Sequence, residues 1–329
     1  MSWRRLARLL ARRWPRRHVN ERVQQIVAFY RSAPPEPPVR VSGLDVRARW
    51  ARTAAILNEA APAWPVATHR VGECDGYPVS VAVYAAGGAG PHPGVLFIHG
   101  GAWVAGSPAT HHRLCIRFAE RGYTVFSVDY PLAPEHRFPA GLDGCALAAA
   151  WVRAHAVEMG VDAERLVIAG DSAGANLAAA LLDRIIGQEG RAPFRAAVLP
   201  YGVYDFPAML RIPTGAPFVN GATFAWQVED YVGPGATPER LRDPGISPRY
   251  GAHLGGYPPT LLTVGTSDPL LEQSREFAAA LQAAGVAAEL RTYEAMPHAF
   301  LQIEDLPGCR DALAAIWRFL AEAVLGRAG

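Results

Sequence analysis

The sequence predicts an α/β fold, with a mostly parallel central sheet and helices on both of its faces. Short apolar runs alternate with helical patterns from about residue 65 onward, which is typical of parallel strands covered on both sides. Half of the 329 residues are hydrophobic, enough for one large core or a domain with a cap. The alternation breaks at about 203–258, a stretch rich in Pro, Gly and aromatic residues, where we expect an insertion over the sheet.

Each element of the alternation has its own pattern. The first strand expected, 79–86 (VSVAVYAA), alternates as a half-exposed strand does. Apolar runs predict the remaining strands at 94–100, 123–130, 165–171, 195–202, 260–268 and 288–294. Helical patterns occupy 112–122, 140–159, 173–187, 274–285 and 310–324.

Residues 1–60 precede this alternation, and we expect them to form a separate helical segment. Helical patterns at 3–14 and 46–60 flank the stretch SAPPEPP, whose four prolines predict a stiff linker. We therefore divide the chain into an N-terminal helical segment, 1–60, and a main domain, 61–329, which carries the insertion at about 203–258.

Composition excludes several classes of protein. The net charge is only +2, so the overall charge does not point to a nucleic-acid-binding protein. The positive charge is concentrated near the start, where residues 4–17 hold seven arginines. No uninterrupted apolar stretch reaches the roughly 18 residues of a membrane span, and Arg8 and Arg12 interrupt any signal-peptide core. We expect a soluble, cytoplasmic protein with no integral membrane segment.

The cysteines predict neither a metal site nor a disulfide framework. They are scattered and form no CxxC or Cys/His cluster, so we expect no metal and no cofactor. Two of them lie in apolar helical contexts and are expected to be buried as small hydrophobic residues. The four are Cys74, Cys115, Cys145 and Cys309.

The segment VIAGDSAGANLAAALL (167–182) places Ser172 at a sharp bend between a strand and a helix. Ligands of open α/β sheets gather at the carboxyl ends of strands, where this serine lies. Gly170 and Gly174 let the strand and the helix approach closely around a strained serine backbone. The letters alone are a weak signal, and an ordinary strand-to-helix turn is the alternative, but the context favours a nucleophile.

A serine nucleophile needs a base, and in this arrangement the base follows it in the sequence. Only His253 and His298 follow Ser172. The segment YEAMPHAFL puts His298 just past a strand, at the end of the sheet, whereas His253 lies in the insertion. We therefore favour His298, with a solvent-facing turn histidine as the alternative.

The base in turn needs an orienting carboxylate, which should end the preceding strand. In TLLTVGTSDP, Asp268 ends that strand and Pro269 stops it. Glu272 and Glu276 follow, but on the next expected helix. Asp268 is the favoured acid, and an Asp-Pro turn is the alternative.

Backbone N–H groups for a developing oxyanion are expected in FIHGGAW (97–103). Consecutive glycines let amides turn toward one point without a side chain in the way. Gly100 and Gly101 are the natural donors, together with the N–H of Ala173. A Gly-Gly turn without a catalytic role is the alternative. His99 precedes Ser172, so we expect it to brace this loop instead of acting as the base.

These motifs together resemble the hormone-sensitive-lipase-like esterases, a branch of the α/β-hydrolases (bacterial family IV). The matching pieces, in the order of that family, are HGGAW, YPLAPEHRFPAGLDG, GDSAGAN, SDPL and PHAF, between about residues 95 and 300. The resemblance implies Ser172, Asp268 and His298 as a catalytic triad. It also implies hydrolysis of short- to medium-chain carboxylic esters without a cofactor or metal. Glu135 and His136 precede the serine, so we expect them to be structural.

Some residues depart from the family pattern. Ala102 replaces the usual third glycine and Trp103 follows it, a form that also resembles arylformamidases. Hydrolysis of formamides or other amides therefore stays open. Some relatives that act as hormone receptors lack the catalytic histidine, so a ligand-binding protein is a further alternative, which the presence of His298 disfavours.

Aromatic residues in and near the insertion suggest contacts to an apolar part of a small-molecule ester, with packing of the insertion as the alternative. The residues expected to contact substrate are Trp103, Phe218, Phe224 and Trp226. The resemblance also implies that residues 1–60 help to cap the site, although their arginines and apolar stripe would suit a membrane surface as well. A homodimer is possible.

Overall fold

The computed structural model describes residues 43–59, 61–212 and 221–326, and it contains one eight-stranded sheet. The strand order is β1-β2-β4-β3-β5-β6-β7-β8. The pairs β1/β2 and β2/β4 are antiparallel, and all other neighbouring pairs are parallel. The strands are β1 (Val66–Cys74), β2 (Tyr77–Tyr84), β3 (His92–Ile98), β4 (Thr124–Asp129), β5 (Val161–Gly170), β6 (Ala196–Pro200), β7 (Thr260–Gly265) and β8 (Ala288–Tyr293).

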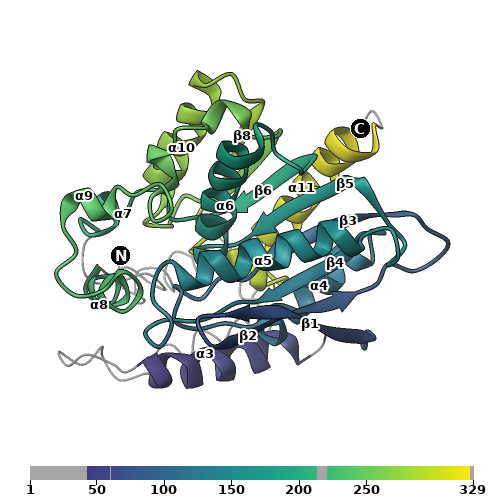
Figure 1. The fold of residues 1–329 in the computed structure, drawn as a ribbon, viewed down its shortest axis with the longest axis horizontal. Helices are drawn as coiled ribbons and strands as arrows, with labels where there is room; N and C mark the ends of the chain where they lie inside the picture. Colours follow the sequence, from purple (N-terminus) through teal and green to yellow (C-terminus); the bar gives the residue numbers. More distant parts are fainter. Residues whose placement is uncertain (1–42, 60, 213–220, 327–329) are drawn as a thin grey trace.

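Helices cover both faces of this sheet (Figure 1). One core contains buried residues of α5, α6 and α10, and the other contains those of α4 and α11. The two cores lie on opposite sides because successive strand residues point to opposite faces. The helices are α3 (Gly43–Asn58), α4 (His112–Ala119), α5 (Ala140–His155), α6 (Ala173–Glu189), α7 (Phe206–Met209), α8 (Gly221–Val232), α9 (Pro238–Leu241), α10 (Leu271–Ala283) and α11 (Pro307–Leu325), with 3-10 turns η2 (Pro108–His111), η3 (Pro248–Tyr250), η4 (Leu254–Gly256) and η5 (Phe300–Gln302).

The predicted α/β alternation is confirmed, and two details differ. Strand β1 was not predicted, because its sequence VATHRVGEC is polar and mostly exposed, as an edge strand permits. Strand β2 was expected to be half-exposed, but Val79 and residues 81–84 are buried. It lies between β1 and β4, and both α4 and α5 pack against it.

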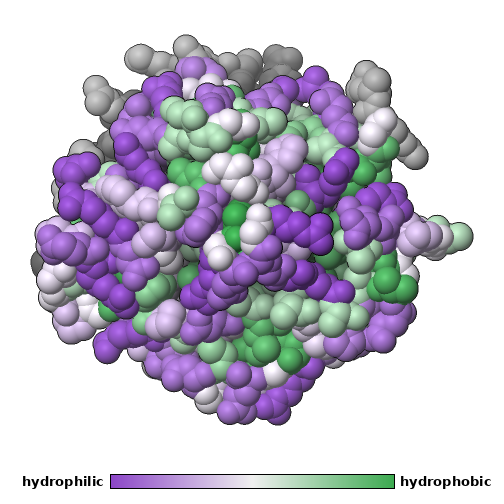
Figure 2. Space-filling model, turned by 45° about the horizontal axis from the view of Figure 1, so that its top comes forward, coloured by the Kyte–Doolittle hydropathy of each residue, from purple (hydrophilic) through white to green (hydrophobic). Residues whose placement is uncertain are grey.

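The segment 203–258 lies between β6 and β7. It contains α7, α8 and α9, which lie beyond one end of the sheet (Figure 1). Phe206, Met209 and Tyr231 pack in the same core cluster as α6, so the segment is anchored to the main domain. No helix in the described part of the chain is both long and apolar enough to cross a membrane. On the face in Figure 2, hydrophobic residues form separate patches among hydrophilic ones.

Helix α3 confirms the helical pattern expected at 46–60, and it packs against η2 and α4. The guanidinium of Arg47 donates to the carbonyl oxygens of Val104 (2.7 Å) and Ala133 (2.8 Å), and it pairs with Glu135. This residue therefore connects α3 with the segments that follow β3 and β4. The helix expected at 3–14 lies outside the described residues.

Candidate active site

Ser172 forms a strained turn between β5 and α6. Its φ of 55° and ψ of −119° fall outside the regions that residues with a side chain usually adopt. The turn requires glycine on both sides: a Cβ at Gly174 would lie against the carbonyl oxygen of Ile98, and one at Gly170 would lie 2.6 Å from the same oxygen. These contacts give the physical reason for the two glycines that the sequence pattern singled out.

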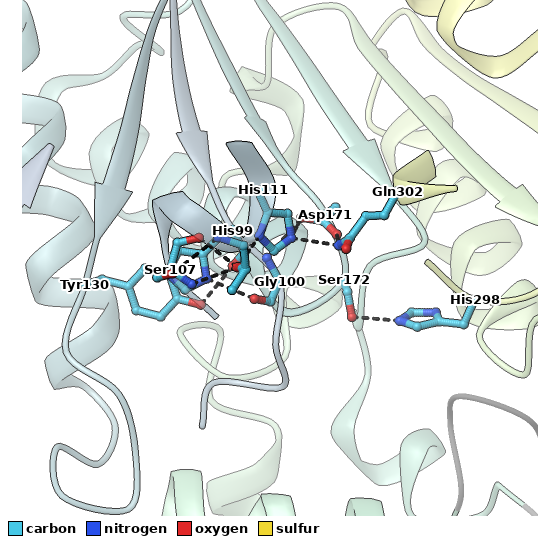
Figure 3. Close-up of polar contacts among 10 residues, drawn as sticks. His99, Gly100, Ser107, His111, Tyr130, Asp171, Ser172, His298 and Gln302 are labelled. Carbon is cyan, nitrogen blue, oxygen red and sulfur yellow. Dashed lines mark hydrogen bonds and ion pairs between the residues drawn. The ribbon is translucent and has the colours of Figure 1, made fainter. Parts of the chain in front are cut away.

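The structure brings Ser172, His298 and Asp268 into one hydrogen-bonded chain. Oγ of Ser172 lies 2.8 Å from Nε2 of His298 (Figure 3), and Nδ1 of His298 lies 2.8 Å from Oδ2 of Asp268. The backbone N–H of Leu270 donates to the other carboxylate oxygen of Asp268 (2.8 Å), which fixes its orientation. His298 and Asp268 are 6% and 4% exposed, so water competes little for these bonds.

The loops that carry the acid and the histidine touch each other directly. Ser267 donates its backbone N–H to the carbonyl oxygen of Met296 (3.1 Å). Gly265, at the end of β7, has no room for a Cβ because that carbonyl lies against it. The ring of Tyr201 stands edge-on to the imidazole of His298 at 5.0 Å. The ends of β7 and β8 therefore fix the distance between acid and base.

The expected oxyanion loop follows β3 and corrects one prediction. The N–H of Gly100 donates to Oδ1 of Asp171 at 2.9 Å, so this amide is engaged and does not point to a substrate. Gly101 (φ 131°), Ala102 (φ 53°) and Trp103 (φ 63°) then turn through the left-handed region. Within the described residues, no partner accepts from the N–H of Gly101 or Ala102. Ala173, the first residue of α6, has no intrahelical acceptor for its N–H.

Trp103 was expected to contact substrate, but it is 1% exposed. Its Nε1–H donates to Oδ1 of Asn176 (3.1 Å), and its ring stacks on Tyr231 with centroids 4.8 Å apart. Phe206 lies equally close. The indole is surrounded by protein, so the structure assigns it to packing between the oxyanion loop and the insertion.

The other three expected substrate contacts have different environments. Phe224 is buried in the core cluster that holds Trp103, so it too packs the insertion. Trp226 is half-buried and keeps accessible surface. Phe218 lies outside the described residues.

The contacts of His253 and His136 lie away from the triad. His253 donates its backbone N–H to Asp183, in the middle of α6, and not to the serine turn. His136 pairs with Asp75, while its neighbour Glu135 pairs with Arg47, so these two form no acid–base couple.

His99 braces the loop between β3 and Gly101. Its Nδ1 donates to the carbonyl oxygen of Gly100 (2.9 Å), and its ring stacks on Tyr130 at 4.3 Å. Burial, followed by the nearby His111, lowers the pKa of His99 to about 3, so the imidazole is neutral at pH 7.

Sequence reasoning missed a buried polar cluster beside the nucleophile, made of His111, Asp171 and Gln302 (Figure 3). Asp171 stood in a quoted motif, but nothing in the sequence connected it with the other two. No group of three or more His, Cys, Asp or Glu in the described residues could hold a metal ion.

Comparison with known proteins agrees with this architecture. A profile described as alpha/beta hydrolase fold matches residues 95–302. The chain is similar to the ethyl acetate hydrolase of Pseudomonas putida, 33% identical over 214 residues, and to the carboxylic ester hydrolase LipN of Mycobacterium tuberculosis, 34% identical over 238 residues. The matches cover 64% and 68% of this chain but 66% and 61% of those proteins, slightly less than two thirds of their length.

Solved structures resemble a larger part of the chain. An esterase of Pyrobaculum calidifontis superposes with a TM-score of 0.79 at 29% identity, over 88% of this chain and 96% of that one. The esterase LipW of Mycobacterium marinum gives 0.74 at 32% identity, over 85% and 90%. The chain belongs to the α/β-hydrolase fold family. Within it, the motifs and these relatives place it in the hormone-sensitive-lipase-like branch.

Proposed function

We propose that this chain is a serine carboxylesterase that hydrolyses short- to medium-chain esters through an acyl-enzyme intermediate. The observation that carries the proposal is the hydrogen-bonded chain from Ser172 through His298 to Asp268. The names of the relatives, an ethyl acetate hydrolase and a carboxylic ester hydrolase, support an ester as the substrate.

In the proposed mechanism, Oγ of Ser172 attacks the ester carbonyl carbon while Nε2 of His298 takes its proton. Asp268 holds the imidazole in the tautomer that can accept this proton, and it stabilises the imidazolium that forms. The C–O bond to the alcohol then breaks, and His298 returns the proton to the leaving oxygen. Water repeats the same steps on the acyl-enzyme and releases the acid.

The negative charge on the carbonyl oxygen needs donors that are already in position. We assign this role to the N–H groups of Gly101, Ala102 and Ala173. The N–H groups of Gly101 and Ala102, unlike that of Gly100, have no acceptor within the described residues. Ala173 is the first residue of α6, directly after the nucleophile. The reaction so written needs no cofactor.

A fluorophosphonate probe tests the nucleophile and separates an enzyme from a binding protein on this scaffold. Phosphorus forms a bond to Oγ of Ser172, Nε2 of His298 takes the hydroxyl proton, and fluoride leaves. We expect one label per chain, located on Ser172 by mass spectrometry. A protein that binds the probe reversibly, or that carries the label elsewhere, would contradict the assignment.

The leaving group is tested separately, because the same triad could cleave an amide. p-Nitrophenyl esters with acyl chains of increasing length should give the highest kcat/KM for the short and medium chains. N-formylkynurenine, a formamide, should be a poor substrate. A higher kcat/KM for the formamide than for the esters would show that the protein is an arylformamidase instead.

We also propose that residues 1–60 and the insertion at about 203–258 together cap the site. The bond from Arg47 on α3 to Val104, just past the oxyanion loop, and the packing of Trp103 on Tyr231 support this arrangement. A cytoplasmic location and a homodimer are proposed from the sequence. Cell fractionation and light scattering after size-exclusion chromatography test them.

A further inference from the structure

The carboxylate of Asp171, one residue before the nucleophile, is only 1% exposed. Three groups from three separate segments lie around it (Figure 3). Its Oδ1 accepts from the N–H of Gly100 (2.9 Å) and lies 3.1 Å from Nε2 of His111, and its Oδ2 accepts from the amide of Gln302 (3.1 Å). A buried carboxylate is costly unless such partners compensate it.

These partners keep the carboxylate ionised. Burial by itself raises the pKa of Asp171, but His111, Gln302 and Gly100 outweigh that effect and lower the pKa to about 2. The group therefore carries a full negative charge at neutral pH. Removing one partner would leave that charge under-compensated and would shift the remaining contacts.

Two of these partners, Gly100 and Gln302, belong to segments that must be aligned for the reaction. Gly100 begins the oxyanion loop, and the next residue, Gly101, is a proposed donor. Gln302 ends η5, whose N-cap residue, Ala299, directly follows His298. Asp171 itself adjoins Ser172. One carboxylate thus connects the donors, the base and the nucleophile.

His111 and Gln302, the two side-chain partners of Asp171, also lie in contact with each other. The amide nitrogen of Gln302 lies 2.8 Å from Nε2 of His111. On the other side of the ring, Nδ1 of His111 lies 2.8 Å from Oγ1 of Thr110, which forms a capping box with Ser107 at the start of η2. The imidazole therefore has polar contacts at both ring nitrogens, and a rotation away from Asp171 would disrupt them.

We propose that His111 and Gln302 are positioning residues that act through Asp171 to hold the oxyanion loop in register with Ser172. Neither residue touches the reacting atoms. The proposal rests on the esterase function above and adds a second buried polar cluster to it. Its consequence is that loss of either residue affects the transition state more than the binding of the substrate.

The test uses the full chain with Gln302→Met and His111→Phe, which keep most of the volume but remove the polar contacts. We expect kcat for p-nitrophenyl butyrate to fall by about 10- to 100-fold, less than the 10²–10³ for loss of a direct donor, with KM changed little. Binding of a trifluoromethyl ketone, whose adduct with the serine places an oxyanion in the hole, should weaken by the same factor. His111→Gln, which retains a hydrogen-bonding group, should recover part of the loss.

His112→Phe is the matched control, because His112 is adjacent in sequence but contacts Tyr84 at 3.1 Å instead of Asp171. It should leave kcat and ketone affinity unchanged. If the test variants lower the melting temperature while kcat and ketone affinity stay at wild-type values, the cluster is structural only and the proposal is wrong. Should one variant fail to fold, the other and His111→Gln still decide between these outcomes.

Failure of the esterase function is distinguishable from failure of this proposal. If the wild-type protein neither turns over esters nor takes the fluorophosphonate label, the function is wrong. Amide hydrogen exchange then tests the cluster without activity. We expect faster exchange at residues 100–103 in Gln302→Met than in His112→Phe, and equal exchange would overturn the positioning role.

Discussion

Nδ1 of His298 lies 2.8 Å from Oδ2 of Asp268, and the N–H of Leu270 donates a hydrogen bond to the other carboxylate oxygen, Oδ1. The carboxylate therefore offers the imidazole one oxygen in one orientation. This contact selects the tautomer of His298 whose Nε2 can accept the serine proton.

Asp268→Asn should therefore preserve the fold and lower kcat by on the order of 10⁴-fold, because an amide N–H facing Nδ1 stabilises the wrong tautomer. The kcat for hydrolysis of p-nitrophenyl esters, compared between the variant and the wild type, measures this loss. Asp183→Asn is a matched control, since Asp183 is also buried but accepts from the backbone of His253. A loss below tenfold for Asp268→Asn, or an equal loss for both, would contradict the role of Asp268.

Gly174→Ala should prevent the serine turn from forming. A Cβ there would lie against the carbonyl oxygen of Ile98, and backbone cannot move aside as a flexible side chain can. We expect a marked drop in melting temperature and loss of fluorophosphonate labelling. Gly87→Ala, where a Cβ would meet nothing within 4 Å, should be neutral. Normal labelling of Gly174→Ala would show that the close approach of β3 and α6 is not required.

Asp171 should make stability depend on pH in the acid range. Its pKa is about 2 in the folded protein against 3.8 for an unperturbed group. A carboxyl group with a lowered pKa stabilises the fold above its unfolded value and loses that contribution as pH falls through its folded value. The stabilisation, about 2 kcal/mol, should thus be complete above pH 4 and disappear toward pH 2.

Urea unfolding of the wild type and of Asp171→Asn at several pH values measures this contribution. The difference between their free energies of unfolding should shrink by about 2 kcal/mol as the pH falls from 5 to 2. A constant difference over that range would mean that the carboxylate has no lowered pKa.

Arg47→Met should loosen the contact between α3 and the segments that follow β3 and β4. The guanidinium donates to Val104 and Ala133 and pairs with Glu135, and hydrogen bonds from a charged group contribute about 1.5–3 kcal/mol each at most. We expect lower stability and a raised KM for longer esters. Arg70→Met, which removes an exposed pair with Glu73, is the control and should change neither. Equal behaviour of the two variants would argue against α3 as part of a cap.

Much of the site was predictable because its parts are local in sequence. The turn at Ser172 needs small residues at fixed spacing, and Asp268 and His298 each follow a recognisable strand. The order of these elements in the fold then brings them together. The polar edge strand β1 carried no apolar pattern, so it was missed.

The rest depends on contacts between distant segments, which spacing does not reveal. The direction of the Gly100 N–H is set by Asp171, 71 residues later, so the sequence could not exclude this amide as an oxyanion donor. Gln302 and His111 are separated by 191 residues and belong to no motif. Trp103 was expected to face substrate. Its actual partners, Phe206 and Tyr231, belong to the insertion more than 100 residues later, so its neighbours in the sequence did not indicate this packing.

The central claim, that Ser172 is the nucleophile of an esterase, is tested most directly by Ser172→Ala. The substitution removes only Oγ, so circular dichroism and melting temperature should match the wild type. Hydrolysis of p-nitrophenyl butyrate should fall by at least about 10⁴-fold, and His298→Ala should be comparably damaging because the members of a triad act as a unit. A folded Ser172→Ala protein that kept a substantial part of the wild-type kcat would contradict the account.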